Sequence, residues 1–248
     1  MFKARLGESA LLKSGIDAVA QLITETTLNL SNEGIRMTAM DAANVSLIDL
    51  SLSKSAFESF ELDKEQSIGV SLEDLTRILK RAKADQPIDL TLTDENRLEI
   101  VINGKRKFDI PLLDLGSKPP KKPNLSFAAT IDFKISLLED AIADTEIVSD
   151  AITFETGKDT LNIFAEGDGR KVEINLNREE EAILDINSKE AVSSMFPIDY
   201  LRKISKGAKM ADSATLFLGK DYPLKLELRD KDSKFELSYI LAPRIENE

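Results

Sequence analysis

The chain has 248 residues, no cysteine and no histidine, and a formal net charge of −11 at pH 7. This inventory excludes disulfides, cysteine nucleophiles, histidine bases and zinc sites built from cysteine or histidine. The length suits two domains of ordinary size, each with its own core. Residues 1–6 lack an apolar signal core, and no later segment approaches the length of a membrane span, so we expect a soluble intracellular protein.

The first half of the chain shows the periodicities of an α+β domain. Apolar residues at three- and four-residue steps predict two amphipathic helices, over residues 9–23 and 71–83. Ser71 suits the N-cap of the second helix, and either Ser9 or Glu8 suits the first. Alternating apolar residues predict strands at residues 2–6, 28–30, 35–39, 45–52, 57–62, 68–70, 88–92, 98–102 and 108–112, with a hairpin turn at Asn103-Gly104.

The second half repeats this order of signals. Helices are predicted from Ser136 to Ile147 and from Ile198 to Met210. Gly167-Asp168-Gly169 is too short for a phosphate or calcium loop and predicts a hairpin turn. Strands are predicted at residues 129–133, 152–154, 161–165, 172–176, 215–217, 224–228 and 235–241.

A proline-rich segment, residues 115–127, separates the halves. Its three prolines remove backbone donors and fix φ, so it cannot form an interior strand or helix and favours an extended, semi-rigid path. We therefore predict a first domain at residues 1–114, a connector at residues 115–127 and a second domain at residues 128–248.

A constant shift of 126 residues aligns the two halves without an internal gap. It superimposes Leu75, Ile78, Leu90 and Leu98 on Leu201, Ile204, Leu216 and Leu224. One plan used twice indicates two tandem repeats of a domain in which two helices pack on antiparallel sheets.

The helices differ in charge. Lysines and arginines ride on the second and fourth helices, and the repeat places Lys80 and Lys83 at the positions of Lys206 and Lys209. A charge run on a helix is usually a solvated face, but two equivalent basic faces in an acidic chain favour sequence-independent phosphate contacts that salt weakens. The third helix departs from this pattern, because it carries Glu139, Asp140, Asp144 and Glu146.

Carboxylate pairs suggest one alternative function. Asp41 with Asp49, or Glu166 with Asp168, would supply oxygen ligands for a metal-dependent nuclease or phosphotransferase that uses the basic helices for substrate. Turn chemistry and solvated strand faces explain the same residues. We therefore expect no catalytic residue, no metal and no cofactor.

Short blocks of sequence, in one order from Met1 to the tail, also resemble those of a known family. They are Met1-Phe2-Lys3-Ala4-Arg5-Leu6, Ala39-Met40-Asp41, Val45-Ser46-Leu47, Ile68-Gly69-Val70, Leu113-Asp114-Leu115, Tyr222-Pro223-Leu224 and Leu241-Ala242-Pro243-Arg244-Ile245. Together they closely resemble the proliferating cell nuclear antigen (PCNA) family, the sliding clamps of archaea and eukaryotes. The acidic chain with its short tail looks most like the archaeal members. Asn44 stands where many members carry histidine.

The resemblance implies a non-enzymatic processivity factor that forms a trimeric ring around duplex DNA, with helices lining the hole and sheets forming the outer wall. We expect a homotrimer, although the sequence leaves a ring of related chains open. Partners implied are DNA polymerase, clamp loader, ligase and flap nuclease, bound through short peptide motifs. The expected location is the cytoplasm with the nucleoid, or the nucleus in a eukaryote.

The resemblance and the helix pattern together define three sets of candidate residues. The DNA-facing set is Lys13, Arg77, Lys80, Lys83, Arg202, Lys206 and Lys209. The partner-peptide groove, under the connector, is Met40, Val45, Leu47, Pro123, Leu125, Phe127, Pro223, Ala242 and Pro243, with Lys118, Lys121 and Lys122 nearby to attract acidic flanks. The subunit interface is Phe108 and Ile110 against Val172, Ile174 and Leu176.

Overall fold

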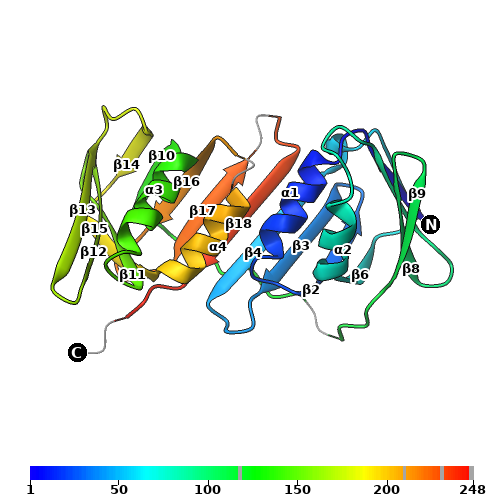
Figure 1. The fold of residues 1–248 in the computed structure, drawn as a ribbon, viewed down its shortest axis with the longest axis horizontal. Coiled ribbons are helices and arrows are strands. Elements are labelled where there is room, and N and C mark those ends of the chain that lie inside the picture. The colour runs from blue at the N-terminus through cyan, green and yellow to red at the C-terminus, as the bar shows by residue number, and fades with distance from the viewer. Residues whose placement is uncertain (117–118, 209–210, 230–231, 246–248) are drawn as a thin grey trace. The chain divides into compact units, whose positions relative to one another are not determined.

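The computed structural model describes residues 1–116, 119–208, 211–229 and 232–245 (Figure 1). The chain divides into two compact units, and each takes a short segment from the other half of the sequence. Unit 1 comprises Met1–Ala42, Ile48–Lys122 and Arg229–Leu237, and unit 2 comprises Ala43–Leu47, Pro123–Leu228 and Ser238–Glu248. No helix in the described ranges is long and apolar enough to cross a membrane.

Unit 1 contains two neighbouring helices and two antiparallel sheets (Figure 1). The helices are α1 (Ala10–Val19) and α2 (Leu72–Leu79). One sheet has the order β5 (Ser59–Leu62), β1 (Phe2–Leu6), β7 (Ile88–Leu92), β8 (Arg97–Ile102) and β9 (Arg106–Pro111). The other contains β4 (Ser46–Ser53), β3 (Gly34–Met40), β2 (Glu25–Ser31) and β6 (Gln66–Ser71), and a short 3-10 turn (Lys54–Ala56) follows β4.

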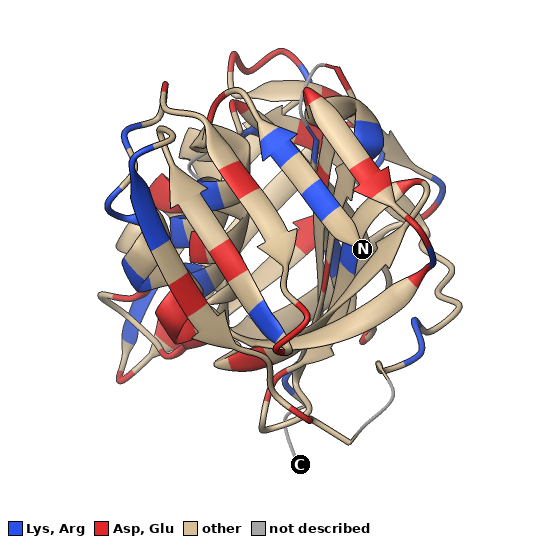
Figure 2. Ribbon diagram, turned by 90° about the vertical axis from the view of Figure 1, so that its right-hand side faces the viewer, with Lys and Arg blue, Asp and Glu red and all other residues tan. Residues whose placement is uncertain are grey.

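The five-stranded sheet of unit 1 carries both acidic and basic residues on its outward side (Figure 2). Arg5 on β1 reaches across to Asp89 on β7, with Nη1 at 2.7 Å from Oδ1, and also pairs with Glu58 at 3.0 Å. Lys107 on β9 pairs with Glu99 on β8. The ion pairs Arg5–Asp89 and Lys107–Glu99 join neighbouring strands and so stabilise the sheet on its exposed face.

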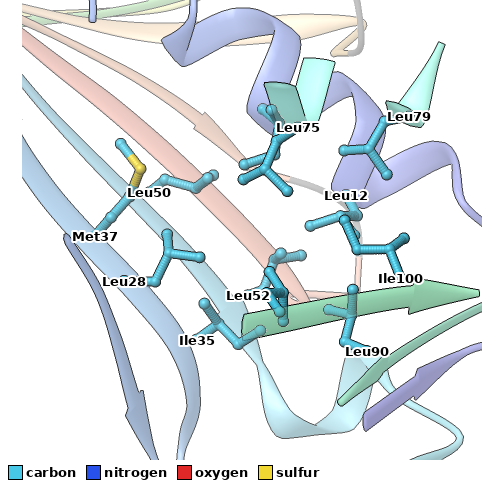
Figure 3. Close-up of a pocket in the computed structure, with 12 residues that line it drawn as sticks. Leu12, Leu28, Ile35, Met37, Leu50, Leu52, Leu75, Leu79, Leu90 and Ile100 are labelled. Carbon is cyan, nitrogen blue, oxygen red and sulfur yellow. The ribbon is translucent and has the colours of Figure 1, made fainter. Parts of the chain in front are cut away.

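The core of unit 1 lies between its helices and sheets. Leucine and isoleucine side chains from α1 and α2 meet those of β2, β3, β4 and β8 around an enclosed cavity of about 30 Å³ (Figure 3). Its lining is wholly apolar, which is the composition of cavities that stay dry.

Unit 2 is built on the same plan. Its helices are α3 (Ile135–Thr145) and α4 (Ile198–Ala208). One sheet has the order β13 (Arg170–Asn177), β12 (Thr160–Gly167), β11 (Ala151–Thr156) and β15 (Val192–Pro197). The other contains β14 (Ile183–Ser188), β10 (Ala129–Lys134), β16 (Ser213–Leu218), β17 (Leu224–Arg229) and β18 (Phe235–Leu241), of which residues 235–237 belong to unit 1.

The structure confirms the α+β class and the predicted repeat. Leu72 and Ile198, the first residues of α2 and α4, are 126 positions apart, and so are Gln66 and Val192, the first residues of β6 and β15. Strands β14 and β15 were not predicted, because their apolar alternation is broken by polar residues. One of these is Ser194, which is 3% exposed and donates to Gly219 O at 3.0 Å.

The predicted helices run too far at their C-terminal ends. Beyond Leu79, Arg81 and Ala82 bond to carbonyls three residues back, at 2.9 and 3.0 Å, so the chain tightens into 3-10-type turns. Likewise α1 ends at Val19 and α3 at Thr145, and the predicted end of α4 at Met210 lies outside the described residues.

Local signals at caps and turns had mixed outcomes. Ser71 is confirmed as the N-cap of α2, since its side chain accepts from Asp74 N at 3.1 Å. Ser9 occupies the N-cap of α1 but forms no capping bond, because its hydroxyl bonds elsewhere. The turns at Asn103-Gly104 and Asp168-Gly169 are confirmed, all four residues having positive φ.

Candidate functional site

The exposed lysines of unit 1 gather where α2 ends. Lys80 is the C-cap of α2, and Lys83 follows in the next turn. The carbonyl of Lys83 accepts a hydrogen bond of 2.8 Å from Ser9 Oγ, which ties this turn to the start of α1. Lys13 on α1 is half-buried and its Nζ donates to Ala82 O at 3.3 Å. Predicted DNA-facing residues from both helices therefore lie beside one turn.

The arginines of the DNA-facing set differ from the lysines. Arg77 pairs with Glu73 and, at 3.7 Å, with Asp74 on its own helix. Arg202 pairs with Asp199 and, at 3.8 Å, with Glu146. In contrast, no ion pair to Lys80, Lys83 or Lys206 forms within the described ranges, and all three are exposed. These three lysines are thus the charges of these faces that form no ion pair in the described ranges.

Asp17 is a carboxylate within the same basic face, and sequence reasoning missed it. It lies on α1, and its Oδ1 is buried without a hydrogen-bond partner among the described residues. Burial raises the pKa of Asp17, and the charges of Lys80 and Lys13 oppose that rise. The apolar spacing of α1 gave no signal of this burial.

The helical layer of unit 2 has mixed charge. Lys203 and Lys206 are exposed on α4, and Lys203 Nζ lies 5.6 Å from the centre of the Tyr200 ring. Lys209, predicted to face DNA, lies outside the described residues. The neighbouring α3 carries exposed Asp140 and Asp144. Among the described residues of its helical layer, the basic face of unit 2 is therefore confined to α4.

Aromatic residues surround the end of the connector. Phe127 lies 5.5 Å from Phe217 and 5.9 Å from Tyr222 between ring centres. Pro223 follows Tyr222 and is half-buried, as is Leu125, whereas Pro123 is exposed. Sequence reasoning missed Phe217 and Tyr222, although Tyr222 begins one of the blocks that carry the family resemblance.

A second part of the predicted groove joins two distant segments of unit 2. The amide of Ala242 donates to Val45 O at 2.9 Å, and Val45, Ala242 and Pro243 are all half-buried. Leu47 is only 3% exposed, so its side chain belongs to the core rather than to an open surface.

The remaining groove residue lies in unit 1. Met40 is 38% exposed and lines a pocket of about 250 Å³ together with Leu115, Pro119 and Pro120 of the connector. The first part of the connector therefore lies over the end of β3, and it leaves apolar surface open there.

Two edge strands carry the predicted subunit interface. β9 ends the five-stranded sheet of unit 1, and β13 ends the four-stranded sheet of unit 2. Along β13, half-buried Val172, Ile174 and Leu176 alternate with exposed polar residues. On β9, Phe108 is half-buried and Ile110 is buried.

The carboxylate pairs do not assemble a metal site in the described part of the chain, where no group of three or more candidate ligands occurs. Asp49 is held by Arg36, Thr38 and Lys122. Asp168 lies in a hairpin turn, 3.5 Å from Arg170. Each therefore has a structural role.

Comparison with known proteins places both halves of the chain in one family. Residues 1–115 match the proliferating cell nuclear antigen N-terminal domain, and residues 121–244 match the C-terminal domain. The chain is 37% identical to the DNA polymerase sliding clamp of Thermococcus fumicolans over 94% of each chain. It is 34% identical to that of Methanothermobacter thermautotrophicus over 100% of each.

Solved structures agree. PCNA from Thermococcus kodakaraensis superimposes with a TM-score of 0.93 at 28% identity, covering 98% of this chain and 100% of that one. PCNA from A. fulgidus, bound to the C-terminal region of FEN-1, superimposes with a TM-score of 0.92 at 30% identity, and both chains are fully covered. The chain, with its two tandem domains, belongs to the proliferating cell nuclear antigen family.

Proposed function

We propose that this protein is a DNA polymerase sliding clamp, a processivity factor that encircles duplex DNA and tethers replication and repair enzymes. The observation that carries the proposal is its full-length similarity to relatives named DNA polymerase sliding clamp, through both domains. In this proposal residues 1–114 and 128–248 are the clamp domains, residues 115–127 connect them, and the protein resides with the DNA in the cytoplasm.

Ring formation is proposed through the two edge strands. An unpaired edge exposes backbone donors and acceptors, and pairing β9 of one subunit with β13 of the next would satisfy them. Each chain carries both edges, so head-to-tail pairing of identical chains closes a ring when the rotation fits. We propose a homotrimer with Phe108, Ile110, Val172, Ile174 and Leu176 at the junction.

DNA contact is proposed through the exposed lysines that form no ion pair in the described ranges. Lys80, Lys83 and Lys206, with Lys13, Arg77, Arg202 and Lys209, would touch phosphates transiently, so the ring slides without reading sequence. Their positive charge sits on helices of a chain whose net charge is −11, so phosphates are attracted to these faces and repelled elsewhere.

Partner recognition is proposed along the connector. A peptide with one aliphatic and two aromatic anchors would contact Met40, Phe127 and Pro223, with Val45, Pro123, Leu125, Ala242 and Pro243 around them. The structure of A. fulgidus PCNA bound to FEN-1 supports a flap nuclease as one partner. Polymerase, clamp loader and ligase are the others we propose. Each buried anchor contributes roughly 1.5 to 3 kcal/mol before ordering costs, which predicts micromolar affinity.

A topological assay tests the function. After loading onto a nicked circular plasmid by a clamp loader, the protein should comigrate with the plasmid and should be released when the plasmid is cut once. A protein that stays bound after linearisation holds DNA by direct contact, and the clamp proposal would then be wrong. Hydrolysis of nucleic acid with magnesium or manganese would favour the nuclease alternative.

A further inference from the structure

The described residues of the connector lack the backbone hydrogen bonds that hold the rest of the described chain. The last such bond before it joins Leu113 N to Gly69 O at 2.9 Å, and the first after it joins Ala128 N to Leu218 O at 3.0 Å. Between these, the described connector residues (115–116 and 119–127) form no backbone bond to either unit. The position of the connector must therefore come from its side chains.

One side chain joins the connector to a charged group in unit 1. Lys122 Nζ forms an ion pair with Asp49 Oδ2 on β4. No other described connector residue makes an ion pair with the protein. The neighbouring Lys121 is exposed and pairs with no acidic group in the described ranges, although it has the same charge and adjoins Lys122 in the chain.

The carboxylate of Asp49 is held in place by other residues besides Lys122. Its side chain is 3% exposed, although it lies on a sheet face beside exposed Arg36. Thr38 Oγ1 donates to Asp49 Oδ1 at 2.6 Å, and Arg36 Nη2 donates to Oδ2 at 3.1 Å. Burial alone would raise the pKa of Asp49, but hydrogen bonds from Arg36, Lys122 and Thr38 outweigh it and hold that pKa below its ordinary value. The carboxylate therefore stays charged.

Lys122 is the separable member of this cluster. Arg36 and Asp49 already balance in charge, and Arg36 and Thr38 come from the adjacent strand of the same sheet. Removing Lys122 leaves Asp49 with its partners on β3, so the sheet keeps its ion pair. The connector loses its ion pair with β4 and keeps its apolar contacts, among them those of Phe127 with Phe217 and Tyr222.

Prolines on both sides of Lys122 extend the effect of its ion pair to neighbouring connector residues. Pro119, Pro120 and Pro123 stiffen the chain on both sides of it, and only four residues separate Lys122 from Phe127. We infer that Asp49 is a positioning residue that fixes the connector through Lys122 and so sets the place of Leu125 and Phe127 for a partner peptide. This inference rests on the proposed connector groove.

The test uses one pair of matched variants. Lys122→Ala removes the attachment, and Lys121→Ala removes the same charge from the neighbouring position. Chymotrypsin cleavage after Leu125 or Phe127 reports the freedom of the connector without any partner. Lys122→Ala should speed cleavage several-fold, Lys121→Ala should leave it unchanged, and Lys122→Arg should restore it. Concentrated salt should speed cleavage of the wild type but not of Lys122→Ala, because salt screens the ion pair.

Binding of a synthetic peptide with one aliphatic and two aromatic anchors is the second readout. Lys122→Ala and Asp49→Asn should each weaken it roughly 5- to 30-fold, the factor that corresponds to 1–2 kcal/mol, and the double variant should be no weaker than Asp49→Asn. Unfolding temperature and oligomer mass of Lys122→Ala should match the wild type. A merely structural ion pair would lower the unfolding temperature and leave peptide affinity in the folded protein unchanged.

The two readouts separate the two proposals. A wild-type protein that binds no such peptide overturns the groove, whereas the cleavage rates alone still decide the attachment. Equal cleavage of Lys122→Ala and Lys121→Ala overturns the attachment, even if the peptide binds.

Discussion

The hydroxyl of Ser9 donates a hydrogen bond of 2.8 Å to the carbonyl of Lys83, although the two residues are 74 positions apart. Ser9 is fully buried at the start of α1, and Lys83 lies in the exposed turn after α2. A residue that would ordinarily cap its own helix instead fixes the turn that presents Lys83.

Ser9→Ala should therefore affect stability and DNA contact together. It removes a part-buried hydrogen bond, and the net contribution of such a bond to stability is about 0.5–1.5 kcal/mol. Urea unfolding should show a lower midpoint with an unchanged slope. Ser14→Ala, at a half-buried serine within α1, is the control and should change the midpoint little. Equal midpoints for both variants would remove the role we give to Ser9.

Charge reversal tests the DNA-facing lysines. Lys80→Glu combined with Lys206→Glu should lower clamp-stimulated DNA synthesis severalfold, and the difference from the wild type should shrink as salt rises, because salt weakens the phosphate contacts that the variant lacks. Lys64→Glu with Lys158→Glu makes the same change of net charge at exposed turns and should leave synthesis unchanged. Normal synthesis by the first pair would show that these helices do not face DNA.

Substitution of Asp17 should increase stability and DNA affinity, whereas the lysine substitutions should reduce clamp-stimulated synthesis. Its raised pKa means that the folded state binds the proton more tightly than the unfolded chain. Ionised Asp17 therefore costs stability above its folded pKa, and the cost disappears as the pH falls through that pKa. Asp17→Asn should raise the unfolding temperature at pH 7, and the gain should shrink toward pH 4.

The same substitution removes a negative charge beside Lys13 and Lys80. Affinity for short duplex DNA should rise, with a steeper dependence on salt. Asp144→Asn on the acidic helix α3 removes an equal charge from unit 2 and serves as the control. An unfolding temperature that is lower than the wild type at pH 7 would contradict the direction of the pKa shift.

The apolar side of edge strand β13 allows a test of the proposed subunit interface. Ile174→Asp places a carboxylate among half-buried side chains of β13, where ring closure would bury it. We expect monomers at micromolar concentration by light scattering, with the unfolding transition of the monomer retained. Asn175→Asp adds the same charge to the opposite side of the strand and should leave the trimer intact. Trimers in both variants would place the interface elsewhere.

Sequence patterns gave the repeated elements of this fold but not their partners. Helix periodicity and the shift of 126 residues locate α2 and α4, and the same shift would have located β14 and β15 from the strands predicted at residues 57–62 and 68–70. Polar residues hid those two strands, because a buried serine such as Ser194 is satisfied by hydrogen bonds that only the folded chain supplies.

The candidate sites show the same limit. Basic residues on α2 and α4 follow from spacing alone, because helix geometry is local. The burial of Leu47, the ring contacts of Phe127 and the pairing of Lys122 with Asp49 depend on segments far apart in sequence. Residues 43–47, 229 and 232–237 also pack in the unit opposite to their own half of the chain, which no local pattern indicates.

Phe127 is the sharper test of the partner groove than Leu47. Because Leu47 is buried, Leu47→Ala would cost about 2–5 kcal/mol through a core cavity and would confuse folding with binding. Phe127 is half-buried and keeps contact with Phe217 and Tyr222. Phe127→Ala should weaken a two-aromatic peptide at least tenfold by calorimetry, since a half-open aromatic surface is lost.

The matching control truncates a different aromatic residue. Phe164 is also half-buried but lies on β12, between β11 and β13, so Phe164→Ala should leave peptide affinity unchanged. Both variants should remain trimeric, because neither residue lies on β9 or β13. If Phe164→Ala weakened peptide binding and Phe127→Ala left it unchanged, the partner site would lie at β12 and not at the connector.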